Sequence, residues 1–368
     1  MQWIWKDKRW PNYNYNYEPF RAYEEKFLLN AGTILGLMDA LSSLQKEEIH
    51  VQILAEEAYA TSFIEGEILD RSSLISSVKK YLGIHILPNK FGQKESGIAE
   101  LIVDINQNPT KKLDAALLFE WHNMMMFGNK GIQSIGYYRT HSEPMQIVSG
   151  NYSNNKIFYE APQSNQVASL MDKFFEDFNT MLEDQFQYPN LLFAAIMHLR
   201  FEQIHPFEDG NGRIGRAIIE KILAQRLGFY SFNSLSKLIN ENRKQYYNAL
   251  QQTNTQLNIQ TYLEFFTELV LNAQEHTIET IKFVVYKSKV MNKFQSMLNL
   301  RQEKVLLRIF DEGLKGFVGG LSAANYKSIT NASNATVTRD LQELMEIGIL
   351  SKQGQLKSSR YYLNKDII

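Results

Sequence analysis

One short segment of the sequence has the composition of a phosphate-binding loop. Residues 204–216 read Ile-His-Pro-Phe-Glu-Asp-Gly-Asn-Gly-Arg-Ile-Gly-Arg. Because Pro206, Gly210 and Gly212 are unfavourable inside a helix, the segment predicts a loop that opens into a helix near Arg213. The backbone N–H groups of such a loop and the positive end of the following helix can bind phosphate. The two glycines also allow a ligand to approach the backbone closely.

Four side chains of this segment suit the transfer of a phosphate-containing group. Arg213 and Arg216 are three residues apart, so they share one helix face and can reach the same polyphosphate. A polyphosphate normally arrives with Mg²⁺, which takes one or two carboxylates, and Asp209 is placed to supply one. The imidazole of His205 can take a proton from an attacking hydroxyl near neutral pH. The alternative, a simple connecting loop with solvated arginines, leaves the register of glycines and arginines unexplained.

The segment matches the Fic family signature His-x-Phe-x-Asp/Glu-Gly-Asn-Gly-Arg-x-x-Arg at every defined position, and the resemblance extends over about residues 113–253. It implies an AMP transferase that moves adenylate from ATP to a Ser, Thr or Tyr hydroxyl of a protein, with self-modification a common expectation. It also implies His205 as base, Asp209 as Mg²⁺ ligand, and Phe207 as the residue that packs the loop into the core. The implied nucleotide-binding residues of the loop are Asp209, Gly210, Asn211, Gly212, Arg213 and Arg216.

A second motif lies upstream, at the end of a helix expected to begin near Glu47. The sequence Thr61-Ser62-Phe63-Ile64-Glu65-Gly66 resembles the inhibitory motif of the family, Ser/Thr-x-x-x-Glu-Gly/Asn, and Gly66 fits a helix C-cap. The resemblance implies that Glu65 pairs with Arg216 and removes the arginine that should hold the γ-phosphate. The enzyme would then be inactive at rest. The alternative is a solvated charge at a helix end.

Two further segments resemble parts of the family that contact the nucleotide. The run from Met145 to Pro162 predicts a β-hairpin, similar to the Fic flap, whose exposed strand edge would align the target segment. The residues implied to border the nucleotide there are Val148, Ser149 and Gly150. A helix around Tyr246 resembles the adenine side of the site, with Tyr247, Leu250 and Asn254 on one face. Tyr246 itself is expected to pack in the core, and an ordinary surface hairpin is the alternative for the flap.

The elements around these motifs are predicted to be mainly helical. Apolar residues at helical spacing predict helices over residues 113–126, 163–183, 191–202 and 213–227, and a long helix from 259 to about 299. The expected fold class is mainly α, with a Fic-fold helical core, a small β-hairpin flap, a helical N-terminal domain and a C-terminal winged helix. The expected domains are 1–85 with the inhibitory helix, 86–290, and 291–368.

The sequence of the last domain is typical of a winged helix-turn-helix. Ser333 is the expected N-cap of a helix over 334–347, and a β-like pair is expected near Leu350 and Tyr361. Candidate DNA contacts there are Thr336, Thr338, Arg339 and Gln342 on the helix and Lys352, Lys357 and Arg360 on the wing. A second hypothesis is therefore a DNA-binding regulator with a nucleotide-sensing core, although a sensor would not need His205 as a base. A protein-contact role of this domain and removal of AMP by the enzyme are left open.

The overall composition is that of a soluble, folded protein. Hydrophobic residues make up 44% and charged residues 21% of the 368 residues, and the net charge of -1 creates no field that would favour nucleic acid or a membrane. Without cysteine, disulfides and thiolate metal sites are excluded, and the cytoplasm is the expected location. No export signal is visible, and no apolar run approaches the ~18 residues of a membrane span. The oligomeric state, a homodimer included, is left open.

Overall fold

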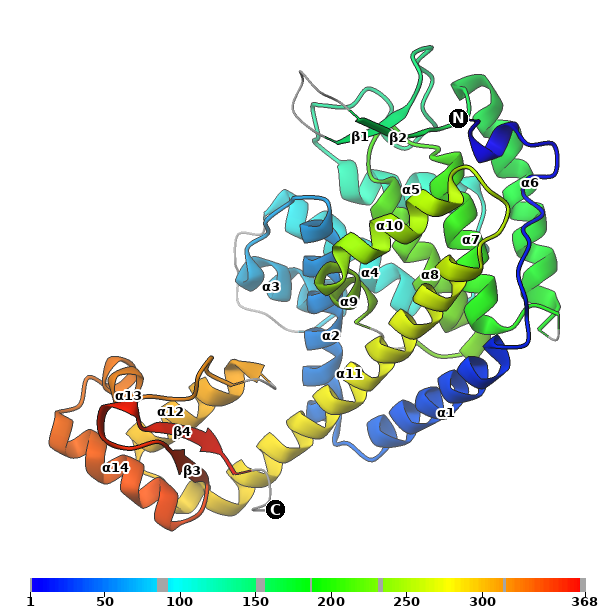
Figure 1. Cartoon of the computed structure of the whole chain (residues 1–368). Coiled ribbons are helices and arrows are strands. Elements are labelled where there is room, and N and C mark those ends of the chain that lie inside the picture. The colour runs from blue at the N-terminus through cyan, green and yellow to red at the C-terminus, as the bar shows by residue number, and fades with distance from the viewer. Residues whose placement is uncertain are drawn as a thin grey trace. The chain divides into compact units, whose positions relative to one another are not determined.

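The computed structural model describes residues 2–84, 92–149, 156–185, 187–230, 234–313 and 316–364 (Figure 1). The chain divides into two compact units, one of Met1–Gly36 and His50–Thr277 and the other of Leu37–Ile49 and Ile278–Ile368. The mainly α fold class is confirmed, since helices make up most of both units. In the part of the chain that the structure describes, no helix is both long and apolar enough to cross a bilayer.

The helical elements, in chain order, are η1 (Ile4–Lys6), α1 (Phe20–Asp39), α2 (Ser43–Ile64), α3 (Arg71–Tyr81), α4 (Gln93–Gln107), α5 (Ala115–Met126), α6 (Ser164–Glu183), α7 (Asn190–Ile204), α8 (Asn211–Leu227), α9 (Leu235–Glu241), α10 (Arg243–Thr253), α11 (Gln260–Phe294), η2 (Gln295–Met297), α12 (Leu300–Asp311), α13 (Ala323–Thr330), α14 (Asn334–Glu346) and η4 (Leu356–Ser358). Two antiparallel pairs of strands complete the described structure: β1 (Gln146–Ser149) with β2 (Lys156–Glu160), and β3 (Leu350–Gln353) with β4 (Arg360–Leu363).

Helix α7 lies at the centre of the first unit. Its sequence is apolar on almost every side, and Phe193, Met197 and Phe201 are among its fully buried residues. Such an all-round apolar helix must be covered by other elements. Helices α5, α6, α8 and α10 surround it in Figure 1. The loop between α7 and α8 is therefore held between two buried helices.

The predicted hairpin is present. Strand β1 pairs with β2 in antiparallel register, with Ile147 opposite Tyr159 and an irregularity between Ile147 and Val148. Tyr159 packs with Ile4 in a small apolar cluster, and its hydroxyl donates to the backbone oxygen of Gln203 near the end of α7 (2.6 Å). The hairpin is therefore fixed to the central helix at its base. Gly150, at the predicted tip, lies outside the described residues.

The second unit has the order of elements that the sequence predicts. Helices α12, α13 and α14 are followed by the β3–β4 hairpin, and the hydroxyl of Ser333 caps α14 by accepting from the N–H of Thr336. Two of the predicted helix ends are wrong. The long helix ends at Phe294 rather than near Asn299, because Asn299 is the N-cap of α12 and its side chain accepts from the N–H groups of Arg301 and Gln302. Ser333 caps a helix that ends at Glu346, one residue before the predicted end.

Candidate active site

The predicted loop between α7 and α8 has two left-handed residues. His205 ends α7 with φ 51°, and Gly210 precedes α8 with φ 82°. Helix α8 therefore starts at Asn211, two residues earlier than predicted, because the turn at Gly210 is complete before Arg213. A Cβ at position 210 would also lie 2.5 Å from the methyl carbon of Met126. Only glycine satisfies both the backbone angle and the close contact.

The loop is braced from within by Asn211 and Phe207. The Asn211 side chain accepts from the N–H of Phe207 (2.9 Å) and donates to its carbonyl oxygen (2.8 Å). Phe207 is fully buried, as predicted, and its ring stacks on that of His122 with 4.3 Å between centroids. The amide of Asn211 thus holds the loop in shape. A contact of Asn211 with phosphate would come from its backbone N–H.

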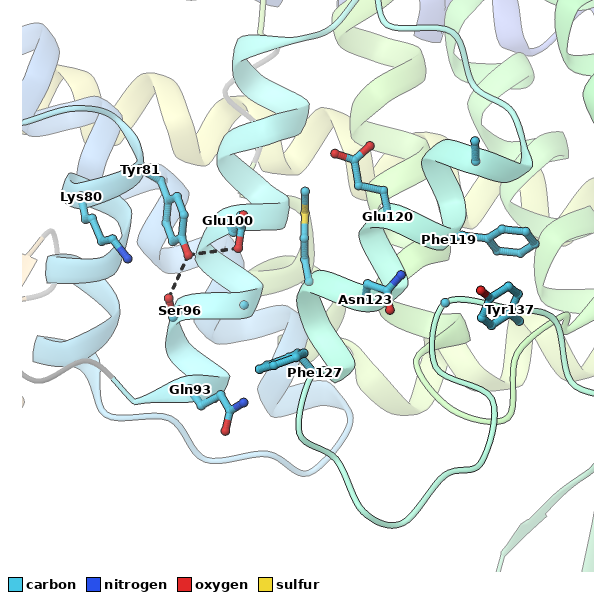
Figure 2. A pocket seen from close by; sticks show the side chains of 14 residues that line it. Lys80, Tyr81, Gln93, Ser96, Glu100, Phe119, Glu120, Asn123, Phe127 and Tyr137 are labelled. Carbon is cyan, nitrogen blue, oxygen red and sulfur yellow. Dashed lines mark hydrogen bonds between the residues drawn. The ribbon is translucent and has the colours of Figure 1, made fainter.

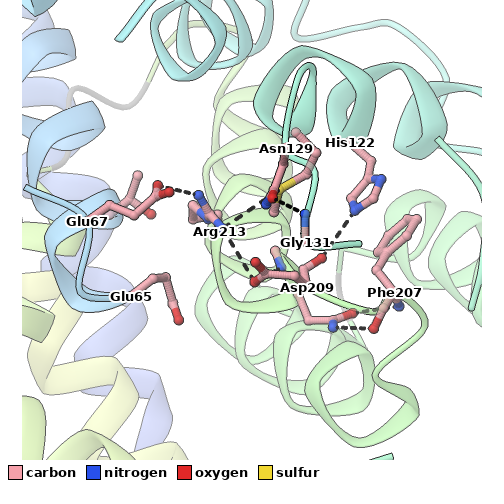
Figure 3. A network of polar contacts seen from close by, with 12 residues as sticks. Glu65, Glu67, His122, Asn129, Gly131, Phe207, Asp209 and Arg213 are labelled. Atoms are coloured by element: carbon pink, nitrogen blue, oxygen red, sulfur yellow. Dashed lines mark hydrogen bonds and ion pairs between the residues drawn. The ribbon is translucent and has the colours of Figure 1, made fainter. Parts of the chain in front are cut away.

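His122 is a contributor to the site that the sequence reasoning missed. Its Nδ1 accepts from the N–H of Gly136 (2.9 Å), so the proton must be on Nε2, which lies 3.1 Å from the carbonyl oxygen of Asp209 (Figure 3). Burial lowers the pKa of His122 and keeps the ring neutral. The neutral ring links the loop around Gly136 to the loop that carries Asp209.

Arg139 is a second missed residue, and it holds the backbone of the loop from outside. Its Nε donates to the carbonyl oxygen of His205 (2.8 Å), one Nη to that of Pro162 (2.5 Å) and the other to the hydroxyl of Ser164 (3.0 Å). The side chain is buried, and burial lowers its pKa to about 10. Arg139 therefore joins the loop before α8 to the chain that leaves the hairpin.

His205 is half-buried at the entrance of the loop. Burial, followed by the charge of Arg139, lowers the pKa of its imidazole to about 4. Its Nδ1 lies 3.4 Å from the carbonyl oxygen of Glu202. The ring is therefore neutral at pH 7, the state that a proton acceptor needs.

The structure brings Glu65 and Arg216 together, as predicted. Nη2 of Arg216 lies 2.7 Å from Oε1 of Glu65 and 2.9 Å from the carbonyl oxygen of Thr61, and Nε lies 2.8 Å from the Thr61 hydroxyl. Arg216 is buried. Burial alone would raise the pKa of Glu65, but the charge of Arg216 and the hydrogen bond to it lower the pKa overall. Glu65 is therefore ionised in this position.

The carboxylate of Glu65 lies against the start of helix α8. A Cβ built on Gly212 would be only 2.4 Å from Oε1 of Glu65. The first turn of a helix, with its N–H groups, attracts anions. Glu65 thus lies at the surface that a phosphate group would approach.

A second carboxylate, Glu67, contacts the other arginine and was not predicted. Oε2 of Glu67 lies 2.6 Å from Nη1 of Arg213, and Oε1 lies 3.1 Å from Nζ of Lys94 on α4. Figure 3 shows Glu67 directed at Arg213 from the segment that follows α2, while Asp209 lies on the other side of the arginine. The only sign of this contact in the sequence is a second glutamate two positions after Glu65.

Asp209 is placed to accept a metal together with a ligand. Half of its side-chain surface is exposed, and Oδ1 accepts from the N–H of Gly210 (2.6 Å) and lies 3.5 Å from Nη2 of Arg213. Within the described ranges, no group of three or more His, Asp or Glu side chains could hold a metal by itself.

The predicted base-side residues lie on or beside α10. Tyr246 is buried, as predicted, with its hydroxyl 3.1 Å from Nε2 of His198, whereas Tyr247 is exposed and Leu250 is partly buried. Asn254 follows the helix and donates to the carbonyl oxygen of Phe158 in β2 (3.2 Å). The amide of Asn254 thus joins α10 to the hairpin, on which Val148 is exposed. The strand residue Ser149 is described for its backbone only.

The predicted DNA contacts lie on the second unit, and their neighbours are acidic. Thr338, Arg339 and Gln342 are exposed on α14, but Gln342 donates to Glu346 (2.9 Å), and Arg339 lies 3.9 Å from Glu343. DNA phosphates would therefore meet two carboxylates on this helix. Thr336 is partly buried at the start of α14, Lys352 is exposed and Arg360 is partly buried on the β3–β4 hairpin, and the side chain of Lys357 is outside the description.

A separate cavity of about 850 Å³ opens beside helices α3, α4 and α5 (Figure 2). It is lined by Tyr81, whose hydroxyl lies 2.9 Å from that of Ser96 and 3.0 Å from Oε2 of Glu100, and by the exposed ring of Phe127. None of the predicted site residues lines this cavity. The residues predicted for the loop before α8 thus lie outside the lining of this cavity.

Parts of the chain match known proteins. Residues 112–223 match the Fic/DOC family, and residues 3–84 match a domain of unknown function, DUF4172. A stretch of 59 residues is 42% identical to a probable protein adenylyltransferase of Aquifex aeolicus and covers 16% of each chain. A stretch of 118 residues is 30% identical to protein adenylyltransferase Fic of Nematostella vectensis, over 31% of this chain and 25% of the relative. The match thus spans a quarter or less of these relatives.

Solved structures share the fold. A Fic family protein of Desulfovibrio desulfuricans aligns over 96% of this chain and 98% of its own with a TM-score of 0.52 and 20% identity. A Fic domain containing signaling protein of Bacteroides thetaiotaomicron aligns over 70% of this chain and 97% of its own, with a TM-score of 0.51 and 17% identity. The family match includes the whole catalytic loop, from His205 to Arg216. Residues 112–223 therefore resemble a Fic/DOC domain, and the solved structures show that the chain shares the fold of Fic proteins.

Proposed function

We propose that this protein transfers AMP from ATP to a hydroxyl group of a protein, and that Glu65 holds the enzyme inactive until it is displaced. The observation that carries the proposal is the carboxylate of Glu65 on the first turn of α8, paired with Arg216 beside a complete catalytic loop. The curated relatives are named as protein adenylyltransferases, which supports ATP as the substrate.

In this proposal the loop residues bind the polyphosphate. The N–H groups at the start of α8 and the guanidinium groups of Arg213 and Arg216 would hold the phosphates. Asp209, together with phosphate oxygens, would hold Mg²⁺, which would offset the negative charge of the leaving pyrophosphate. The backbone contacts of Arg139 and Asn211 keep the loop in this shape before the ligand binds.

The chemical step needs one base. The neutral imidazole of His205 would take the proton of the target hydroxyl as its oxygen attacks the α-phosphorus. A bond forms between that oxygen and the α-phosphorus, the bond from the α-phosphorus to the bridging oxygen breaks, and pyrophosphate leaves. The target segment would align along the free edge of β1 by main-chain pairing. Val148 and Ser149 would then border the nucleotide, and Tyr247 and Leu250 would lie on the adenine side.

Glu65 would prevent this arrangement in the resting protein. Its carboxylate occupies Arg216, which is then not available to the γ-phosphate, and its negative charge at the start of α8 repels the polyphosphate. ATP would bind weakly or in a position from which the α-phosphorus cannot react. Displacement of Glu65 would restore both the arginine and the helix end.

Labelled ATP tests the proposal. The wild type, Glu65→Gly and Glu65→Gly/His205→Ala are incubated with Mg²⁺ and with ATP labelled at the α- or the γ-phosphate. We expect protein-bound label from the α position in Glu65→Gly, little in the wild type, and none in the double variant. Label from the γ position would indicate phosphorylation instead, and no label with either ATP, in the presence of a cell extract as source of targets, would contradict AMP transfer.

A further inference from the structure

Arg139 and Arg213 both lie beside the loop, but their guanidinium groups have different hydrogen-bond partners. Arg139 donates to backbone carbonyl oxygens and a hydroxyl that belong to the fold itself. Arg213 has one close acceptor, the Glu67 carboxylate at 2.6 Å, while Asp209 is at 3.5 Å and the sulfur of Met126 at 4.0 Å. The environment of Arg139 is that of a structural arginine. The environment of Arg213 is that of an arginine held by one replaceable contact.

One donor of Arg213 has no acceptor. Its Nε is buried and finds no hydrogen-bond partner among the described residues. A buried donor without a partner is unfavourable, because it has lost its hydrogen bonds to water and has formed none within the protein. The side chain is thus not fully satisfied in the contact with Glu67. A phosphate group with three acceptor oxygens could satisfy more of its donors.

The position of Glu67 follows from the end of α2. Gly66 has φ 84°, and the N–H of Glu67 returns to the carbonyl oxygen of Ser62 (3.0 Å). This turn directs the carboxylates of Glu65 and Glu67 to the same end of α8. The two arginines that they contact are three residues apart there, and both carboxylates come from the part of the chain that precedes the Fic/DOC match.

We propose that Glu67 is a second, independent determinant of polyphosphate affinity at this site, because its carboxylate competes with phosphate for Arg213. This inference rests on the proposed function and adds to it. Glu65 controls Arg216, and Glu67 controls Arg213, so removal of Glu65 alone leaves the site partly blocked. Lys94 holds the other oxygen of Glu67 and thereby orients the carboxylate toward Arg213. Full access for a polyphosphate requires that both pairs open.

A different role for Glu67 would be to orient Arg213 for the ligand. The two roles predict opposite effects of a neutral Glu67 variant on the affinity for polyphosphate. If Glu67 competes with phosphate, its neutral variant binds polyphosphate more tightly. If Glu67 supports Arg213 in its binding position, the same variant binds polyphosphate more weakly. The unsatisfied Nε and the single close acceptor favour competition.

Binding measurements decide between these roles without turnover. Calorimetric titrations with Mg²⁺-ATP, inorganic tripolyphosphate and AMP are made in a Glu65→Gly/His205→Ala background, with and without Glu67→Gln. We expect Glu67→Gln to tighten binding of ATP and tripolyphosphate about tenfold, and to change AMP binding much less, because AMP lacks the β- and γ-phosphates. Glu67→Ala should act in the same direction, and Glu120→Gln, which removes a surface pair with Lys111, should change nothing.

The outcomes separate the two proposals. If the background variant binds ATP and Glu67→Gln weakens or does not change its affinity, the role of Glu67 is overturned and the proposed function stands. If no variant binds ATP or tripolyphosphate, although thermal unfolding shows each to be folded, both proposals fall. If Glu67→Gln increased the affinity for AMP as much as the affinity for tripolyphosphate, competition at Arg213 would also be contradicted.

Discussion

At the scale of single residues, the proposed chemistry depends on a neutral imidazole at His205. Burial and then the charge of Arg139 lower the pKa of this ring to about 4, whereas the charge of Glu65 acts in the opposite direction. Removal of Glu65 therefore removes a charge that raises the pKa of His205. An ordinary histidine would lose half of its base form near pH 6.5. His205 should keep its base form through that range.

We therefore expect the rate of AMP transfer by Glu65→Gly not to fall by half near pH 6.5. It should decline only as the pH approaches about 4, because protonation of the base begins there. The measurement is the initial rate of incorporation of α-labelled AMP between pH 5 and 8, with circular dichroism at each pH to confirm folding. A rate that halves near pH 6.5 while the fold is intact would show that His205 is not the base or that its pKa is normal.

At the scale of elements, the end of α2 determines where the carboxylates of Glu65 and Glu67 lie, to which we assign the proposed inhibition. Gly66 has a left-handed backbone, and no atom lies within 4 Å of the place where its Cβ would be, so a side chain there meets strain but no clash. An L-residue in this conformation costs about 1 kcal/mol, and Asn tolerates it better than Ala. The position of Glu65 should therefore depend on the residue type at position 66.

We expect Gly66→Ala to lower the free energy of unfolding by about 1 kcal/mol and to raise AMP transfer above the wild-type level, because the strained turn holds Glu65 less firmly. Gly66→Asn should resemble the wild type in both respects. Urea denaturation and α-label incorporation measure the two effects. Equal activity of the Ala, Asn and wild-type proteins would mean that the turn does not control inhibition.

The sequence predicted those elements whose signals are local. The loop from His205 to Arg216 follows from a motif whose residues are close in sequence, and the apolar spacing predicted the helices around it. The pairing of Arg216 with Glu65 joins residues far apart in the chain, and it was predicted only from the resemblance of two motifs to those of the Fic family. The roles of Arg139 and His122 could not be predicted, because most of their partners are backbone groups, and backbone partners leave no pattern in the side chains. The contact of Glu67 with Arg213 was missed for a related reason, because the direction of the Glu67 side chain depends on the backbone turn at Gly66.

At the scale of the whole molecule, two side chains of the N-terminal segment form hydrogen bonds with helix α7 of the first unit. Trp10 Nε1 and the Tyr13 hydroxyl both donate to Oε1 of Gln203, at 2.8 and 2.7 Å. Gln203 precedes His205 by two residues, and its Nε2 donates to the carbonyl oxygen of Thr253, 50 positions further along the chain (3.2 Å). The segment thus helps to fix the end of α7, from which the catalytic loop starts.

The double variant Trp10→Phe/Tyr13→Phe tests these contacts, because it removes both donors and keeps a six-membered aromatic ring at each position, with some loss of packing where phenyl replaces the larger indole. Oε1 of Gln203 is then left without its partners in a buried place, which should lower the free energy of unfolding by about 1–3 kcal/mol. In a Glu65→Gly background, AMP transfer should fall as well, since the end of α7 becomes less ordered. Urea denaturation and α-label incorporation are compared with Tyr137→Phe, a change at an exposed tyrosine that should alter neither. Unchanged stability in the double variant would show that Gln203 finds other donors, and the N-terminal segment would then contribute packing alone.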